Sequence, residues 1–378
     1  MDRRAYVGGL LTGLGALAGC AGRGGSGETS PDESTPTNDS TPTPNQGGTA
    51  PGDIELPLSK SAMHRALPKD AIPAITEPAF GPDWSEVDGL SLTPDDQVIG
   101  VERDGNARAY PLRILDWHEV VNDEFAGPLL VTFCPLCGSG VTAERRVNGE
   151  VTNFGVSGYL WQSDLVMYDA LTDSLWSQIL GKAVRGPKTG TSLSLLPSQL
   201  TRLRTWRESY PDTEVMLPPP ESKTVTGDVA RYDQRGYQGY DQSDRIGIGQ
   251  NDFDDDRLHP KTIVIGITHD DVARAYSLPA VTEAGVINDS VSGLPVVVAA
   301  LPGGSLVAYE RTVDGSVLEF SRADDRHLAA GDSRWALQTG RAIDGQYEGT
   351  QLTQANDRSQ MFWFAWADFH PETELYGN

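Results

Sequence analysis

Short apolar runs separated by turn signals make up most of the chain after residue 58. The turn signals include Asp104-Gly105, Asn148-Gly149 and Asp314-Gly315, which are typical of tight hairpins. Residues 129–133 and 295–300 are continuous apolar runs, and such runs predict central strands that are buried on both faces. The pattern therefore predicts a mainly β fold of the α+β class.

The same pattern occurs twice. Val98-Ile99-Gly100-Val101 and Ala107-Arg108-Ala109-Tyr110 return as Val264-Ile265-Gly266-Ile267 and Ala273-Arg274-Ala275-Tyr276, and the correspondence continues to the end of each copy. We therefore expect a tandem pair of related β-rich repeats with a few short helices. The expected boundaries are 58–217 for the first repeat, 218–261 for a connector and 262–378 for a degenerate second repeat, with helices near 111–121 and 201–210 and at the equivalent second-copy positions.

The first 57 residues follow a different pattern. Arg3 and Arg4 precede a short apolar stretch, and Leu17-Ala18-Gly19-Cys20 resembles a lipobox. Residues 1–19 therefore predict a twin-arginine export signal, after which Cys20 would receive lipid. Residues 20–57, rich in Gly, Ser, Thr and Pro, predict a disordered tether. We expect an exported lipoprotein held on the outer face of the cytoplasmic membrane by the lipid on Cys20.

Charge narrows the possible partners. The formal net charge is −23, which disfavours nucleic acid because phosphate binding needs clustered Lys and Arg. Such an acidic excess is typical of proteins that work at very high salt, where screening removes the self-repulsion, so we expect a halophilic source. No nucleotide cofactor is indicated, and the sequence does not identify a protein partner.

Function is expected where the two copies differ, because positions that both copies share are explained by the shared fold. Trp117-His118-Glu119 becomes Glu283-Ala284-Gly285, and Phe133-Cys134-Pro135-Leu136-Cys137-Gly138 becomes a stretch that begins Ala300-Leu301-Pro302-Gly303. The second copy thus lacks both sulfurs and the imidazole. The first copy also has extra residues around 158–167, which predict an added loop over a site.

These motifs resemble a widespread bacterial and archaeal family, a domain of unknown function. The resemblance rests on Trp117-His118-Glu119, on Phe133-Cys134-Pro135-Leu136-Cys137-Gly138, and on Phe154-Gly155-Val156-Ser157-Gly158 and Ser174-Leu175-Trp176-Ser177-Gln178. It runs from about residue 71 to the C-terminus. The family implies no settled activity, so the chemistry has to be argued from the residues.

A Cys-x-x-Cys pair directly after a buried strand places two sulfurs close together. With the imidazole of His118, Cys134 and Cys137 would offer three soft ligands, which suit copper or zinc better than magnesium or calcium. Met167 on the extra segment could add a thioether. Glu119 and Trp161 are secondary candidates for the same site.

Three alternatives remain open at the level of sequence. Cys134 and Cys137 could act as a thiol-disulfide oxidoreductase, or form an inert disulfide in a plain surface interaction module. A single cysteine with His118 could instead be a catalytic nucleophile. The acidic run Asp252, Asp254, Asp255 and Asp256 lacks the spacing of a calcium loop and is interpreted as solvated linker.

Overall fold

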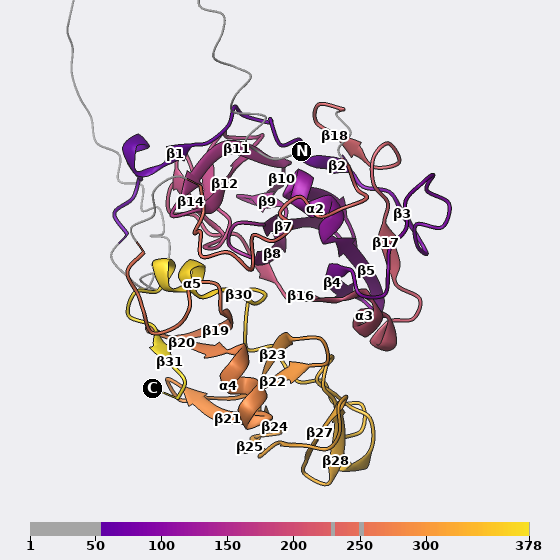
Figure 1. Cartoon of the computed structure of the whole chain (residues 1–378). Coiled ribbons are helices and arrows are strands. Elements are labelled where there is room, and N and C mark those ends of the chain that lie inside the picture. Colours follow the sequence, from indigo (N-terminus) through magenta and orange to yellow (C-terminus); the bar gives the residue numbers. More distant parts are fainter. Residues whose placement is uncertain (1–53, 228–230, 249–252, 378) are drawn as a thin grey trace, which may run out of the picture. The chain divides into compact units, whose positions relative to one another are not determined.

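The structure is a computed structural model, and it describes residues 54–227, 231–248 and 253–377 (Figure 1). The expected export signal and Cys20 lie outside the described residues, as does Asp252 of the acidic run. Among the described residues, no helix has the length and apolar character needed to cross a membrane.

Residues 54–227 fold mainly into sheets. Their orders are β16-β4-β5-β17-β3, β15-β8-β7-β6-β2-β18 and β1-β11-β12-β13-β14, with a separate β9–β10 hairpin. The strands are β1 His64–Arg65, β2 Ile75–Glu77, β3 Phe80–Gly81, β4 Gln97–Arg103, β5 Asn106–Pro111, β6 Val120–Glu124, β7 Pro128–Cys134, β8 Ser139–Glu144, β9 Arg146–Val147, β10 Glu150–Val151, β11 Phe154–Trp161, β12 Asp164–Asp169, β13 Leu175–Ser177, β14 Lys182–Arg185, β15 Leu195–Leu196, β16 Gln199–Arg202, β17 Glu214–Met216 and β18 Lys223–Thr224.

Residues 263–375 form smaller sheets of similar order. These are β30-β19-β20-β31, β21-β22-β23 and β26-β27-β28-β29, with a β24–β25 hairpin. The strands are β19 Ile263–His269, β20 Val272–Ser277, β21 Val286–Val291, β22 Leu294–Leu301, β23 Ser305–Glu310, β24 Thr312–Val313, β25 Ser316–Val317, β26 Ser321–Arg322, β27 His327–Ala330, β28 Ser333–Ala336, β29 Arg341–Ala342, β30 Met361–Phe362 and β31 Glu374–Leu375.

The helices of the described residues are short, and each α-helix has seven residues. They are α2 Leu112–His118, α3 Leu203–Ser209, α4 Leu278–Ala284 and α5 Trp363–Phe369, with 3₁₀ turns η1 Lys60–Ala62 and η2 Gly345–Tyr347. The mainly β prediction with few helices is confirmed at this level. The helix expected over 111–121 ends earlier, because Glu119 adopts a left-handed conformation with φ of 58° and Val120 begins β6.

Equivalent side chains make equivalent contacts in the two halves. Asp123 accepts hydrogen bonds from Arg108 at 2.9 Å and Tyr110 at 2.6 Å. Asp289 does the same with Arg274 at 2.7 Å and Tyr276 at 2.8 Å. The indole of Trp206 donates to Thr213, and that of Trp366 donates to Thr373. The positions that both halves share therefore have a structural role, because they connect neighbouring elements through polar contacts.

The largest apolar core contains residues of both halves. Cys134 and Cys137 belong to it, and so do Trp161 and the α5 residues Trp366 and Phe369. Helix α5 is almost entirely buried, whereas α4 buries only Val281. The second half therefore supplies part of the wall around the cysteine pair.

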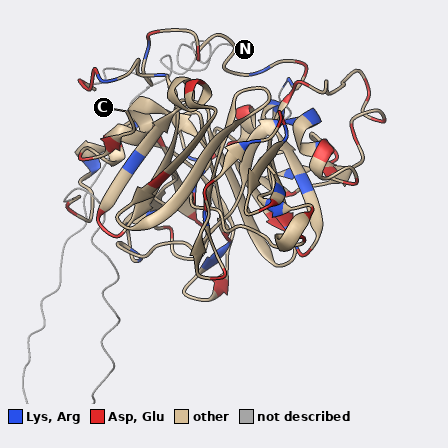
Figure 2. Cartoon of the chain, turned by 90° about the horizontal axis from the view of Figure 1, so that it is seen from below, with Lys and Arg blue, Asp and Glu red and all other residues tan. Residues whose placement is uncertain are grey.

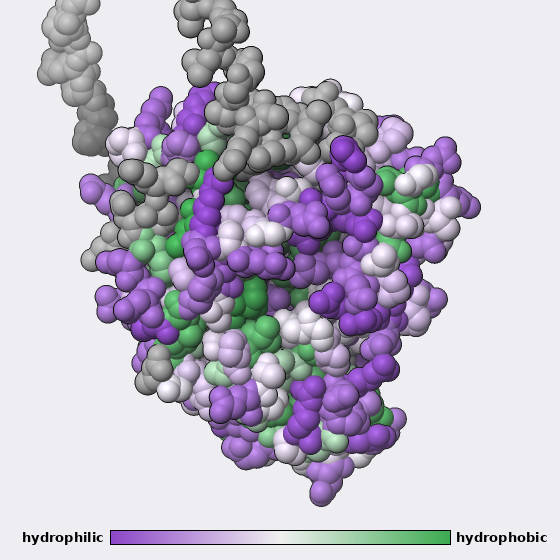
Figure 3. All heavy atoms as spheres, in the orientation of Figure 1, coloured by the Kyte–Doolittle hydropathy of each residue, from purple (hydrophilic) through white to green (hydrophobic). Residues whose placement is uncertain are grey.

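Polar and charged residues are frequent in the two views of Figures 2 and 3. Hydrophilic residues cover most of the face seen in Figure 3. In Figure 2, Lys and Arg are interspersed with Asp and Glu along the strands and loops. The face seen in Figure 3 is typical of a protein that stays hydrated through its charges.

Candidate functional site

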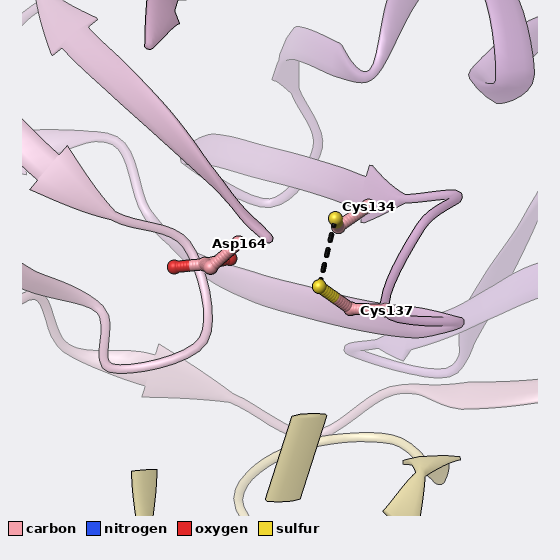
Figure 4. Close-up of side chains that lie close together, drawn as sticks. All are labelled: Cys134, Cys137 and Asp164. Atoms are coloured by element: carbon pink, nitrogen blue, oxygen red, sulfur yellow. Dashed lines mark hydrogen bonds between the residues drawn. The ribbon is translucent and has the colours of Figure 1, made fainter. Parts of the chain in front are cut away.

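A tight turn between two buried strands presents the sulfurs. Cys134 is the last residue of β7 and pairs with Ser139, the first residue of β8. The Cys137 amide donates to the Cys134 carbonyl at 3.2 Å, and Gly138 leaves the turn with φ of 63°, a conformation that glycine adopts without strain. The two Sγ atoms are 3.0 Å apart, and both cysteines are free thiols (Figure 4).

The tip of the β11–β12 hairpin faces this turn. Trp161 pairs with Asp164, so Gln162 and Ser163 form a two-residue turn, and both have positive φ as a type I′ turn requires. The Ser163 carbonyl accepts from the Cys137 thiol at 3.3 Å and from the Cys134 thiol at 3.6 Å. The extra residues of the first copy are therefore strand ends and a turn rather than a loop, because β11 and β12 are longer than β26 and β27.

Asp164 joins the two cysteines from this hairpin. Its carboxylate and both sulfurs offer ligand atoms that all lie within 4.8 Å of one another, and all three residues are buried. Asp164 accepts from the Ser177 hydroxyl at 2.6 Å and from the Ile179 amide at 3.3 Å. Burial nevertheless raises the pKa of Asp164 to about 7, because desolvation outweighs these hydrogen bonds. The carboxyl group therefore gains its full charge only above neutral pH.

The second half closes the site on another side. The Phe362 amide donates to the Cys137 carbonyl at 2.9 Å, and the Phe369 ring packs edge-on against Trp161 with centroids 4.9 Å apart. Asp368 of α5 lies near enough to act on the Cys137 thiol through its charge. Burial and then the charge of Asp254 raise the pKa of Asp368 to about 7. Residues of both halves thus define the electrostatics of the sulfur pair.

These surroundings disfavour a bare thiolate. Burial raises the pKa of the Cys137 thiol well above its usual range, and the neighbouring Cys134, Asp164 and Asp368 raise it further. The exposed fractions of Cys134 and Cys137 are only 2% and 0%. A reactive cysteine normally lies in an accessible and electropositive setting, so the arrangement speaks against a single-cysteine nucleophile. A bound cation would compensate the acidic groups instead.

His118 lies elsewhere, so the expected Cys-Cys-His ligand set differs from the cluster that the structure forms. Its Nδ1–H donates to the Pro73 carbonyl at 2.6 Å, and its Nε2 accepts from the Tyr232 hydroxyl at 2.6 Å. Burial lowers the pKa of His118 to about 4, so the ring is neutral. Both nitrogens are already used, and the ring ties α2 to two distant segments.

The other candidates from the sequence, Met167, Glu119 and Trp161, are buried and pack within the fold. Met167 is buried in β12 opposite Val156 and Trp176. Glu119 is buried at the end of α2, where its carbonyl accepts from the Phe133 amide at 2.9 Å. Trp161 ends β11 beside the site and packs on α5, as described above.

Sequence reasoning missed the acidic members of the site. Asp164 lies within the segment 158–167 that distinguishes the first copy, so this segment was a signal for it. Asp368 left no such signal, because Glu208 stands at the matching position of the first copy. A search for differences between the two halves cannot find Asp368, because both halves have an acidic residue at this position.

The site is therefore a buried dithiol next to a buried carboxylate. The family model described as "Protein of unknown function (DUF3179)" matches residues 69–373, and the chain belongs to this family. The match covers both halves and the connector. No curated protein matches the chain. No solved structure matches it either.

Proposed function

We propose that the protein binds one soft metal ion, copper(I) or zinc(II), through the thiolates of Cys134 and Cys137 with the Asp164 carboxylate as a third ligand. The observation that carries the proposal is the clustering of these three ligand atoms within 4.8 Å in a buried site. Thiolates select soft metals, and a carboxylate oxygen is a normal third ligand of zinc.

Repulsion among the ionisable groups of the site favours the binding of a cation. The sulfurs lie 3.0 Å apart beside the Asp164 carboxyl group, and the charge of Asp368 also acts on Cys137, so ionising all four groups without a cation is costly. A metal ion would displace the thiol protons and cancel this repulsion. Affinity should therefore rise with pH, because each bound ion releases protons from the thiols and from Asp164.

Metal content and thiol counting test the proposal. Cys20 is replaced by Ala in every variant of the full chain, so that thiol counts report only on the pair. The Cys20→Ala protein should bind close to one equivalent of zinc or copper(I), and Cys134→Ser should abolish binding. His118→Phe is the matched control, since it removes a predicted ligand that lies outside the cluster. Loss of metal in the control with retention in Cys134→Ser and Asp164→Asn would refute the assignment.

A second candidate is a dithiol–disulfide couple at the same pair. The 3.0 Å sulfur separation favours it, because oxidation needs only a small approach of the two sulfurs. The Cys134–Cys137 disulfide would form as a partner disulfide breaks, and the two electrons and both thiol protons would pass to the partner, which becomes two thiols. Burial of both sulfurs and the raised pKa of Cys137 argue against rapid exchange. A reversible disulfide without metal binding would favour this function, and a disulfide that resists reductant would indicate an inert staple.

The two halves are best explained by a duplication in which the second half lost its sulfurs and remained as scaffold. The repeated order of strands and helices supports this, as do the matched Arg-Asp-Tyr contacts. Loss of site residues under a kept fold is the expected outcome when only one copy carries the chemistry.

The N-terminal sequence supports a place outside the cell. We infer that Arg3 and Arg4 direct export by the twin-arginine route and that lipid on Cys20 anchors the protein to the membrane. Cys20→Ala should move the protein from the membrane fraction to the soluble exported fraction, and Arg3→Lys with Arg4→Lys should leave it inside. An unchanged distribution in both variants would refute this inference.

A further inference from the structure

The sulfur pair is closed off from solvent, so any ion or reagent needs an opening to reach it. Cys134 and Cys137 expose 2% and 0% of their surface. The turn at Ser163 covers them on one side, and Phe362 with α5 covers them on another. The Ser163 turn joins the paired strands β11 and β12, Phe362 belongs to β30 and the remaining cover is helix α5, so regular backbone hydrogen bonds hold these covers in place.

A third cover comes from the connector. Residues 240–247, which we call the strap, contain neither helix nor strand. The Tyr240 hydroxyl accepts from the Gly247 amide at 2.8 Å, so the strap closes on itself. Tyr240 packs against the apolar core that contains both cysteines, and its ring centroid lies 6.3 Å from that of Phe362, whose amide donates to the Cys137 carbonyl. Segments without regular backbone pairing open at lower free energy than strands and helices do.

Gly247 brings the strap against the hairpin tip that touches the sulfurs. A Cβ added to Gly247 would lie 2.0 Å from the Ser163 Oγ and 2.9 Å from its Cβ. Ser163 is the residue whose carbonyl accepts from both thiols. The strap therefore rests directly on the turn above the site.

A buried lysine fastens the strap. The Lys261 ammonium donates to the Tyr240 carbonyl, to the Ser243 carbonyl at 2.7 Å and to the Ser243 hydroxyl at 3.0 Å. The same nitrogen lies 3.4 Å from the centroid of the Tyr240 ring. Lys261 exposes only 6% of its surface, so little water can reach the Tyr240 and Ser243 oxygens to take the place of the ammonium group.

We propose that the strap is a gate over the Cys134–Cys137 site, and that Lys261 is the latch that keeps it closed. Local opening of the strap, rather than unfolding of the sheets, admits metal ions to the sulfurs. This deepens the proposed metal function, because a gated buried site loads and releases its ion at the rate of strap opening.

Alkylation of the metal-free, reduced, full-length Cys20→Ala protein by iodoacetamide tests the gate without relying on metal binding. The rate of modification of Cys134 and Cys137 is followed by mass spectrometry. Gly247→Ala and Lys261→Met should each raise the rate by at least about tenfold, the factor that corresponds to 1.4 kcal/mol.

Gly239→Ala is the matched control. Gly239 has φ of 78° and Gly247 has φ of 57°, so both substitutions strain the backbone, but a Cβ at Gly239 meets nothing within 4 Å. The control should stay within about twofold of the parent, which is well under the factor for 1.4 kcal/mol. If Gly247→Ala does not fold, the alkylation rate of Lys261→Met alone still tests whether the strap limits access.

Two results would overturn the gate. Equal rates in all four proteins would show that the strap does not limit access. A rate that rises in low urea with the same slope as global unfolding would show that the sulfurs react only in the unfolded chain. If the two variants react faster but no protein binds metal, the gate stands and the metal function fails.

Discussion

Replacing Asp164 by Asn separates the charge of the site from its shape. Asp164 is fully buried, and its pKa is raised to about 7 by desolvation. Asn keeps the size of the side chain and an oxygen that accepts from the Ser177 hydroxyl, while it removes the ionisation. The metal-free protein should therefore lose a pH dependence of its stability.

The sign follows from proton linkage. A carboxyl whose pKa is higher in the folded state than in the unfolded chain binds its proton more tightly when folded, so it destabilises the fold as pH rises. With an unfolded pKa near 3.9 and a folded pKa of about 7, Asp164 should cost the parent roughly 2–3 kcal/mol between about pH 5 and pH 8. Below about pH 4 the difference between the proteins should stop changing with pH.

Urea unfolding at constant ionic strength measures this difference. The free energy of unfolding of the metal-free parent and of Asp164→Asn is compared at several pH values across the window, and the difference should grow in favour of the variant as pH rises. A difference that stays flat, or that grows in favour of the parent, would refute a buried carboxyl with a raised pKa. The same variant should weaken zinc binding by at least roughly 10- to 100-fold, because removing even an outer-shell partner of a metal ligand has an effect of that size.

The remaining predictions concern neighbouring groups. His118→Phe should lower the free energy of unfolding by about 1–3 kcal/mol, because the hydrogen bonds of the ring to Pro73 and Tyr232 are lost. The metal stoichiometry should stay unchanged, and loss of the metal would contradict a purely structural role of His118. Gly266→Ala should destabilise by about 1–3 kcal/mol or more in chemical denaturation, since its Cβ would lie 2.1 Å from the Trp366 ring; a neutral effect would contradict this packing. Asp368→Asn should lower the pKa of the Cys137 thiol, measured as the pH dependence of thiolate absorbance, and an unchanged titration would show that its charge does not reach the sulfur.

Local sequence patterns predicted the elements well. The apolar run at 129–133 lies in β7, the turn signal Asp104-Gly105 joins β4 and β5, and Asn148-Gly149 joins β9 and β10. Helices α2 and α3 lie within the two ranges expected for them. These features depend on hydrogen bonds and side-chain alternation between near neighbours, which a sequence displays directly.

The composition of the site was harder to predict, because distant contacts determine it. His118 stands in a motif near the cysteines in sequence, yet its ring is fixed by Pro73 and by Tyr232, which lies 114 residues away. Asp164 reaches the sulfurs because the β11–β12 hairpin folds its tip onto the turn of β7 and β8. The alternation of apolar and polar residues along a strand does not show which two hairpins will come into contact.

The identity of the atoms around a bound ion tests the central claim most directly. X-ray absorption of the zinc-loaded Cys20→Ala protein should show two sulfur ligands at about 2.3 Å and oxygen at about 2.0–2.2 Å, with no imidazole pattern. Asp164→Asn should alter the oxygen shell and leave both sulfurs. An imidazole ligand that His118→Phe removes, or a first shell without sulfur, would contradict the assignment of Cys134, Cys137 and Asp164 as the metal site.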